Sequence, residues 1–343
     1  MAGLFGPITL AVLSWAGGML PLRVGEGLDR ASTRAGRPEG SGSTALAREV
    51  KVTVLSTMLA GNPGRGTGEW GYAALVEVDG RRILFDTGAR PETVLHNARE
   101  LGIDLAGVTD VILSHNHADH TGGLLTLRRA VMKTNPAALS RVHVAAGIFL
   151  SRRQSGNPAE SNGILPDKAA YEATGGTFIE HPGPVELQPG VWLVGPVPRT
   201  HAERNWSGSL VLETPSGKTE DTVPEDASLV IDTAEGLVVV SGCGHAGIIN
   251  TIDHARRVVR NAPIHAAIGG FHLFAATDDQ LAWTAARLKN AGLGYFLGGH
   301  CTGIEAVYRI RQLTGLDRKR AVVSAVGSTF SLGRGIDGLA LAS

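Results

Sequence analysis

The amino-acid sequence predicts a layered α/β domain, and three observations support this prediction. Strand-like runs occur in both halves of the chain, and each half also has helical patterns of the kind that cover a sheet. No repeat with the period of a solenoid is present. The chain has 343 residues, of which 43% are hydrophobic and 19% charged, so its composition is that of a protein with a large core. This composition argues against a disordered chain and against a multi-span membrane protein.

The first half of the chain alternates strand and helix patterns. Residues 50–57 alternate apolar and polar side chains, as in a half-buried strand. Asp79-Gly80 is a strong turn signal, so residues 72–78 and 82–85 are predicted to form a β-hairpin. Pro91 begins a predicted helix over residues 91–101. The other elements predicted here are a strand at 109–113, a helix at 124–133 and a strand at 142–145.

The second half begins with an irregular segment. Residues 151–190 have weak periodicity and many Gly and Pro, so we expect a long loop, a lid or specificity loop rather than a separate domain. Thr277 and Gln280 have the spacing of a capping box, which predicts a helix over residues 277–289. The other predicted strands cover residues 191–194, 209–213, 228–232, 237–241, 264–268 and 295–297, and the other helices cover 248–260 and 304–313.

The N-terminal 48 residues differ from the rest. Residues 4–22 are apolar but interrupted by Gly and Pro, and no charge precedes Arg23, so the basic start of a secretory signal is missing. Residues 23–48 are rich in Gly, Ser, Arg and Thr and indicate a flexible linker. An atypical export signal, a membrane tether and an unstructured extension remain open, so the protein is exported, tethered or cytoplasmic. Membrane association is expected only through residues 1–22, and residues 49–343 are predicted to form a single domain.

Charge and cysteine content narrow the function classes. Lys+Arg and Asp+Glu are both 32, and this balance argues against a nucleic-acid partner. The two cysteines, Cys243 and Cys301, are too few for a disulfide scaffold. We therefore expect a small-molecule substrate, and no oligomeric state is predicted. The placement of the twelve histidines is the main clue to the chemistry.

The strongest signal is a cluster of metal-ligand residues directly after a predicted strand. His115, His117, Asp119 and His120 fall within six residues of the sequence TDVILSHNHADHTGGL. Imidazole and carboxylate are common ligands of divalent metals. In an extended turn His115 and His117 can point the same way, and the crowding favours two metals over one. The alternative is a solvated polar loop.

Three more histidines lie at glycine-rich ends of predicted strands. They are His245 in Ser-Gly-Cys-Gly-His, His272 in Gly-Gly-Phe-His and His300 in Gly-Gly-His-Cys-Thr-Gly. Glycine allows close approach of the backbone at such positions. Either Cys243 or His245 can be a ligand, and His245 is preferred because imidazole binds a metal without prior loss of a thiol proton. The alternatives are an inert buried cysteine and histidines that hold a ligand by a hydrogen bond.

The sequence His-Asn-His-Ala-Asp-His resembles the His-x-His-x-Asp-His motif of the metallo-β-lactamase fold superfamily, and Asp86-Thr-Gly resembles its supporting strand–turn. The resemblance covers roughly residues 50–330. It implies a four-layer αββα sandwich of two mixed sheets with outer helices. It also implies that His245, His272 and His300 complete the ligand set, with Cys243 bridging or completing the site. Asp86 would hold a ligand histidine by its other nitrogen, and His201 lies where many members carry a metal histidine.

A finer resemblance points to one branch of the superfamily. The segments SHNHADHTGGL, SGCGHAGIINTI, GGFHL and GGHCTG are similar to the branch that includes the archaeal 7,8-dihydropterin-6-methyl-4-(β-D-ribofuranosyl)aminobenzene-5′-phosphate synthases. This chain departs from that branch in its N-terminal extension, in the variable positions of HNHADH and in the Gly of GCGH. The resemblance therefore supports the fold and the metal site more strongly than it supports the substrate of that branch.

The predicted cofactors are two divalent ions, Zn by default, with Fe or Mn as alternatives. We expect a metal-dependent hydrolase that uses a metal-bound hydroxide on a small-molecule ester, lactone or phosphoester, with Asp119 as a ligand that also orients or accepts a proton. The first alternative is a pterin-type condensing enzyme, which needs basic groups for a diphosphate. The second is a non-catalytic metal-binding module. The candidate diphosphate-binding residues are Arg152, Arg153 and Arg199.

Overall fold

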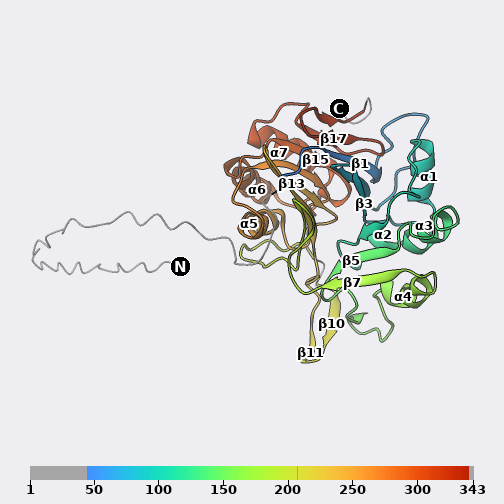
Figure 1. Cartoon of the computed structure of the whole chain (residues 1–343). Coiled ribbons are helices and arrows are strands. Elements are labelled where there is room, and N and C mark those ends of the chain that lie inside the picture. The colour runs from blue at the N-terminus through green and yellow to red at the C-terminus, as the bar shows by residue number, and fades with distance from the viewer. Residues whose placement is uncertain (1–44, 207, 340–343) are drawn as a thin grey trace, which may run out of the picture. The chain divides into compact units, whose positions relative to one another are not determined.

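The computed structural model describes residues 45–206 and 208–339, and two large mixed sheets stacked face to face form its centre (Figure 1). The predictions for residues 1–44 lie outside the described residues. Ala47, within the predicted linker, is buried and its backbone N–H bonds to Asp232 O at 2.8 Å, so the fold begins slightly before residue 49. In the described part of the chain, no helix has the length and apolar character to cross a bilayer.

The first sheet has eight strands in the order β18-β17-β1-β2-β3-β4-β5-β7. The pairs from β17 to β3 are antiparallel, and the pairs from β3 to β7 are parallel. The predicted hairpin is confirmed, with Asp79 and Gly80 at φ 48° and 79°. The strands are β1 (Val50–Ser56), β2 (Ala73–Val78), β3 (Arg81–Phe85), β4 (Asp110–Ile112), β5 (Arg141–Ala145), β7 (Thr177–His181), β17 (Thr329–Ser331) and β18 (Gly335–Asp337).

The second sheet has seven strands in the order β16-β15-β14-β13-β12-β9-β8. Strands β13 to β16 are parallel, and β12, β9 and β8 add antiparallel pairs. Its strands are β8 (Val185–Gln188), β9 (Val191–Val194), β12 (Ser228–Thr233), β13 (Gly236–Ser241), β14 (Ile264–Gly269), β15 (Tyr295–Gly298) and β16 (Ala321–Val323). A small third sheet holds β6 (Arg152–Gln154), β10 (Leu210–Thr214) and β11 (Gly217–Glu220).

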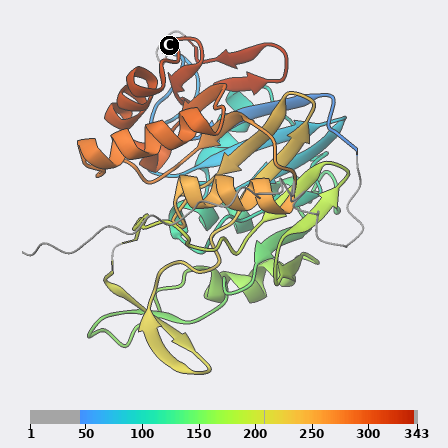
Figure 2. The same cartoon turned by 90° about the vertical axis from the view of Figure 1, so that its left-hand side faces the viewer.

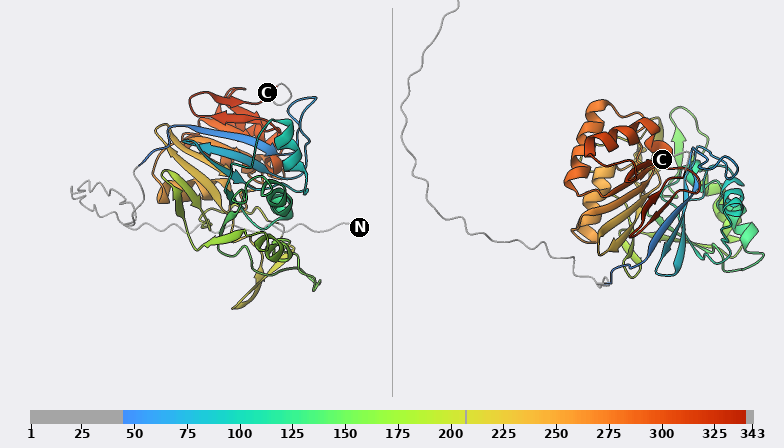
Figure 3. Two further views of the ribbon diagram at one scale, coloured as in Figure 1. Left: turned by 45° about the vertical axis from the view of Figure 1, so that its right-hand side comes forward. Right: turned by 90° about the horizontal axis from the view of Figure 1, so that it is seen from above.

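Helices cover the outer face of each large sheet, as the view from above in Figure 3 shows. One apolar cluster joins the first sheet to α1, α3 and α4, and another joins the second sheet to α5, α6 and α7. The third cluster, which includes Phe85, Ile112 and Val240, lies between the sheets. This is the predicted four-layer αββα sandwich. The helices are α1 (Thr93–Glu100), α2 (Ala118–Thr121), α3 (Leu124–Val131), α4 (Ile164–Glu172), α5 (Ile248–Val258), α6 (Asp278–Asn290) and α7 (Ile304–Thr314).

Burial of both sheet faces explains the sequence of the central strands. Every residue of β12 and β13 is buried, because one face packs on the first sheet and the other on the helices that lie in front of them in Figure 2. Strands covered on both faces have continuous apolar runs rather than alternation. The predicted capping box of α6 is confirmed, since Thr277 Oγ1 accepts from Gln280 N and Thr277 N donates to Gln280 Oε1.

The structure corrects the expectation of a long loop over residues 151–190. This segment contains β6, α4, β7 and β8, and β7 and β8 are edge strands of the two large sheets. Helix α4 buries Ile164 and Tyr171, and the Tyr171 hydroxyl donates to Leu139 O at 2.6 Å. These contacts connect residues far apart in the sequence, which explains why local periodicity did not predict them.

Candidate metal centre and cavity

The predicted ligand residues follow the carboxyl ends of parallel strands in both large sheets. His115–His120 follows β4, Cys243 and His245 follow β13, His272 follows β14, and His300 follows β15. Open α/β sheets bind ligands at this edge. The two sheets are stacked, so these turns meet, and ligand atoms from both sheets lie within 4.8 Å of one another in several groups of three.

One group consists of His115, His117 and His245. Their ring centroids are 4.5 to 4.7 Å apart. Burial holds the pKa of His115 and of His245 well below the ordinary value, and lowers the pKa of His117 to about 4. The rings are therefore neutral near pH 7, which is the form that binds a metal.

A second group consists of Asp119, His120 and His300. His300 Nε2 is 3.3 Å from Asp119 Oδ2 and 3.3 Å from His120 Nε2. Burial acts to raise the pKa of Asp119, but His120 and His300 outweigh it and hold this pKa below its ordinary value. Burial acts to lower the pKa of His120, but Asp119 and Asp86 raise it to about 9. A metal ion bound here would take the place of that proton.

Cys243 lies where the two groups meet. Its Sγ is 3.1 Å from His120 Nε2, and it shares groups of ligand atoms with His115 and with His245. Burial raises the pKa of this thiol, so a bound cation is needed to favour the thiolate. His272 belongs to a group with Cys243 and His245, and Cys301 to one with Cys243 and His300. Both cysteines are free thiols.

Asp86 lies behind the His120 ring. Its Oδ2 is 2.7 Å from His120 Nδ1, and its two oxygens accept from the backbone N–H and the hydroxyl of Ser114 at 2.7 and 2.8 Å. Ser114 Oγ is also 2.9 Å from His115 Nδ1. These contacts fix the orientations of the His115 and His120 rings. The Nε2 atoms of both rings are directed away from Ser114 and Asp86.

A glycine allows the two sheets to approach here. A Cβ on Gly242 would overlap Ser114 Oγ and lie 2.5 Å from Asp86 Oδ2. His272 and His300 adopt φ of 49° and 48°, in the left-handed region that costs energy for residues other than glycine. The surrounding fold holds the backbone in this strained conformation at the place where the ligand atoms lie close together.

The donor set fits a metal centre. The Nε2 atoms of His115 and His245 are buried without a hydrogen-bond partner among the described residues. Buried polar atoms without partners are rare in folded proteins, and a cation facing these nitrogens would satisfy them. His245 Nδ1 meanwhile bonds to Asn205 O, which leaves its Nε2 as the ligand atom.

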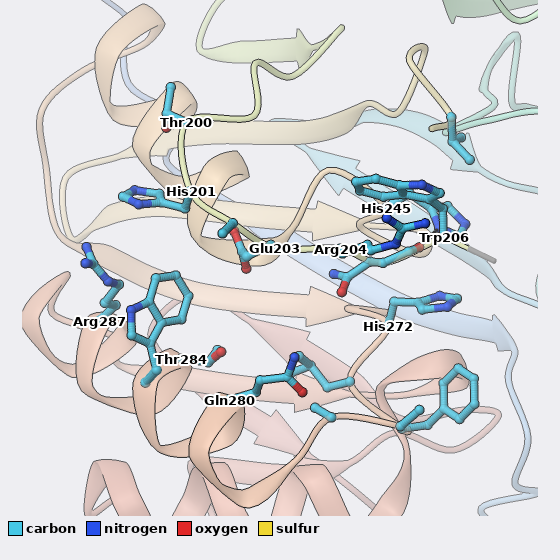
Figure 4. Close-up of a pocket in the computed structure, with 18 of the residues that line it drawn as sticks. Thr200, His201, Glu203, Arg204, Trp206, His245, His272, Gln280, Thr284 and Arg287 are labelled. Atoms are coloured by element: carbon cyan, nitrogen blue, oxygen red, sulfur yellow. Dashed lines mark hydrogen bonds between the residues drawn. The ribbon is translucent and has the colours of Figure 1, made fainter. Parts of the chain in front are cut away.

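A cavity of about 890 Å³ opens onto the group of histidines (Figure 4). His117, His245 and His272 lie at one end of it, and Figure 4 shows Arg287 on the side opposite His245 and His272. Between them the wall includes residues of the 200–206 segment, such as Glu203, which accepts from the backbone N–H groups that begin α5. The cavity is large enough for a ligand of drug-like size.

The candidate His201 and two other histidines lie apart from the histidine groups. His201 lines the far part of the cavity, where its Nε2 is 2.8 Å from Asp253 Oδ2, and it belongs to no ligand group among the described residues. His143 lines a second cavity, of about 640 Å³ near the amino ends of β3 and β4, where it bonds to Asp110 at 3.0 Å, and its Nδ1 is 3.1 Å from His181 Nε2.

The three arginines predicted to bind a diphosphate already have partners. Arg152 is fully buried and pairs with Asp221 at 2.9 Å and Glu225 at 2.5 Å. Arg153 pairs with Glu213 at 2.9 Å. Arg199 donates to two backbone carbonyls, those of Thr222 and Val223, and lies over the Trp206 ring. The expectation that Arg152, Arg153 and Arg199 are free to bind phosphate is therefore wrong for this structure.

The sequence reasoning missed other residues of the site. Ser114 connects Asp86 to His115, and its position directly before the motif was an available signal. The backbone N–H of His300 donates to Thr57 Oγ1 at 3.0 Å, and the Trp70 ring lies 5.0 Å from the His300 ring. Thr57 and Trp70 are far from His300 in the sequence, and no local pattern predicts these contacts.

Comparisons with known proteins agree with this geometry. The metallo-beta-lactamase superfamily profile matches residues 67–219. The 7,8-dihydropterin-6-methyl-4-(beta-D-ribofuranosyl)-aminobenzene-5′-phosphate synthase of Methanocaldococcus jannaschii is 30% identical over 264 residues, which is 75% of this chain and 89% of the relative. The chain is also similar to the solved structure of Tm1679, a metal-dependent hydrolase of the β-lactamase superfamily, with 29% identity and a TM-score of 0.61 over 77% of this chain and 93% of that one.

A more distant structure shares the fold alone. The metallo-β-lactamase fold protein YhfI from Bacillus subtilis is 15% identical, with a TM-score of 0.52 over 83% of this chain and 100% of that one. The sandwich, the His-rich turns at one edge and the similarity to the Methanocaldococcus relative agree. The chain belongs to the metallo-β-lactamase superfamily.

Proposed function

We propose that this protein is a metal-dependent hydrolase that acts on a small-molecule ester, lactone or phosphoester through two divalent ions. The observation that carries the proposal is the set of overlapping three-residue ligand groups, which reaches the cavity through His117, His245 and His272. His115, His117 and His245 would hold one ion, and Asp119, His120 and His300 the other. Zn suits this set of imidazoles, with Fe or Mn as alternatives because a carboxylate takes part.

Cys243 would be a further ligand near both sets, and His272 would lie beside them at the cavity wall. Cys243 shares ligand groups with members of both sets, whereas His272 shares one with Cys243 and His245. When bound, two divalent ions lower the pKa of water toward neutrality and polarise a carbonyl or phosphoryl oxygen. Asp86 and Ser114 would hold the His115 and His120 rings in the orientation in which they bind the ions.

Asp119 is the acidic group that can act on the substrate side. Its side chain is 22% exposed, whereas those of His120 and His300 are fully buried. Its low pKa keeps it ionised, so it can orient an incoming water molecule as well as bind. The substrate would be a small molecule rather than a nucleic acid.

The second candidate function is a condensing reaction on a pterin-like substrate. The 30% identity to the Methanocaldococcus synthase favours it. Its phosphate-binding residues would have to differ from Arg152, Arg153 and Arg199, because these are held by carboxylates or backbone carbonyls. A metal-binding module without turnover is the third candidate.

Metal analysis of the purified full chain tests the proposed centre. We expect about two Zn, Fe or Mn ions per chain, with a sharp fall in the His115→Ala/His117→Ala variant. His96→Ala is the control, because His96 is exposed on α1. One ion or none after reloading would contradict the two-ion centre.

Turnover separates the candidate functions. The metal-loaded chain would be screened with aryl esters, lactones and phosphodiesters, and in parallel for formation of a condensation product from a dihydropterin diphosphate and an aminobenzene donor. Hydrolysis that disappears in the His115→Ala/His117→Ala variant supports the hydrolase. Condensation alone supports the synthase, and two bound ions without either reaction support the binding module.

A further inference from the structure

The wall of the cavity opposite His245 and His272 is one face of α6. Gln280, Trp283, Thr284 and Arg287 line it, and positions three, four and seven apart lie on the same side of a helix. This face carries amide, indole, hydroxyl and guanidinium groups where an apolar stripe would pack on a core. It faces the cavity, so its chemistry indicates what the cavity accepts.

Arg287 is exposed on α6 and stacks on the ring of a neighbouring residue. Its guanidinium carbon lies 4.6 Å from the centroid of the Trp283 ring, and the edge of that ring faces His201 at 5.8 Å. Within the described residues, no carboxylate forms an ion pair with Arg287. The other lining arginine, Arg204, pairs with Glu220 at 2.6 Å and is therefore compensated.

The acidic residues of the cavity do not neutralise Arg287. Glu203 accepts from the backbone of α5, and Asp221 pairs with Arg152. Asp279 is two helical turns before Arg287, about 12 Å along the axis at 1.5 Å per residue. At the end of the cavity away from the ligand histidines, Arg287 thus stacks on an aromatic ring without an ion pair among the described residues, and the carboxylate of Asp253 at that end contacts His201 at 2.8 Å.

We infer that Arg287 binds an anionic group of the substrate, so that the substrates are organic anions whose charged end lies away from the bond that reacts. The inference rests on the proposed function, because the histidine end of the same cavity is where the reaction would occur. The guanidinium stacks on the Trp283 ring, and a planar guanidinium pairs well with a carboxylate or a phosphate. Phe274 and Trp206 supply apolar wall for the uncharged part.

Binding of a matched pair of amides to the metal-loaded full chain tests this inference without turnover. Glutaranilic acid and its terminal primary amide share a phenyl ring and a short tail, and only the acid carries a charge at neutral pH. By calorimetry at low ionic strength we expect the acid to bind about fivefold more tightly, as for a partly exposed charge pair. The preference should shrink in high salt.

Variants identify the side chain that binds the charged group of the acid. Arg287→Gln should remove the preference, and Arg287→Lys should restore part of it. Arg311→Gln is a matched control, because Arg311 lies 4.5 Å from the Tyr308 ring in the same kind of stack on α7, outside the cavity lining. The preference should survive in Arg311→Gln.

Three outcomes would overturn the inference: no measurable binding of the acid, equal binding of the acid and the primary amide, or a preference unchanged in Arg287→Gln. The His115→Ala/His117→Ala variant tests whether the acid binds the ions instead. Loss of the preference there would also overturn the inference. Failure of the proposed hydrolase would appear in the metal count and the turnover screen, which do not involve Arg287.

Discussion

His120 Nδ1 lies 2.7 Å from Asp86 Oδ2, and both side chains are fully buried. This contact directs His120 Nε2 toward Cys243, Asp119 and His300. Asp86 itself is at φ 57° and is fixed by two bonds from Ser114. The carboxylate thus sets the orientation of a ligand ring, and the proposed chemistry depends on it.

Replacing Asp86 by Asn should weaken metal binding about 10- to 100-fold, as is usual for partners of ligand histidines. The amide has one oxygen for three donors, so at least one bond to His120 or Ser114 is lost. Competition with a chelating dye measures the affinity. Asp110→Asn is the control, because Asp110 supports His143 away from the centre. Equal affinity of the Asp86→Asn protein and the parent would contradict the role given to Asp86.

Cys243 should bind metal through sulfur. With Cd²⁺ as the probe ion, the parent protein should show the ultraviolet charge-transfer band of a cadmium thiolate, and Cys243→Ser should lose it because a hydroxyl is a poor ligand for a soft ion. Cys301→Ser should keep the band, since Cys301 Sγ accepts from the His272 backbone N–H and donates to Cys243 O, although it shares one ligand group with Cys243 and His300. A band that persists in Cys243→Ser would show that Cys243 is not a ligand.

Gly242→Ala should destabilise the fold by about 1–3 kcal/mol, because the added Cβ overlaps Ser114 and crowds Asp86 in a packed interior. Urea unfolding of the metal-free proteins measures the free energy of unfolding without a contribution from bound ions. Gly183→Ala is the matched control, since a Cβ there has nothing within 4 Å. An unchanged midpoint for Gly242→Ala would mean that the two turns can move apart at little cost.

The stability contribution of Asp110 should depend on pH. Burial acts to raise its pKa, but hydrogen bonds from His143, Arg141 and Thr109 hold this pKa well below its ordinary value. Its carboxylate therefore stabilises the fold above the unfolded-state pKa of about 4, and this stabilisation disappears as the pH falls through the lower folded-state value.

The corresponding variant is Asp110→Asn. It should lower the free energy of unfolding by about 1 kcal/mol at pH 7, a modest value because the side chain is 22% exposed. The difference should narrow below pH 4 in chelator-treated samples. A penalty that is the same at pH 7 and at pH 3 would mean that the charge of Asp110 is not what stabilises the pair with His143.

The sequence by itself determined features that depend on neighbouring residues. Asp79-Gly80 specifies a turn through backbone conformation, and Thr277 with Gln280 specifies a helix start through two local bonds. The run from His115 to His120 places four candidate ligands in one turn after a buried strand. Each signal lies within a few residues, so it can be read without knowledge of the rest of the chain.

Only the tertiary structure decided how distant residues combine. It grouped His245 with His115 and His117 and grouped His300 with Asp119, because those groupings depend on how two separate sheets stack. It buried Arg152 against Asp221 and Glu225 and removed it from any binding role. It also formed strands in residues 151–190 by pairing them with sheet edges. These contacts are stabilised by side-chain burial and strand pairing between segments far apart in the sequence. Contacts of this kind leave no periodic pattern in the local sequence.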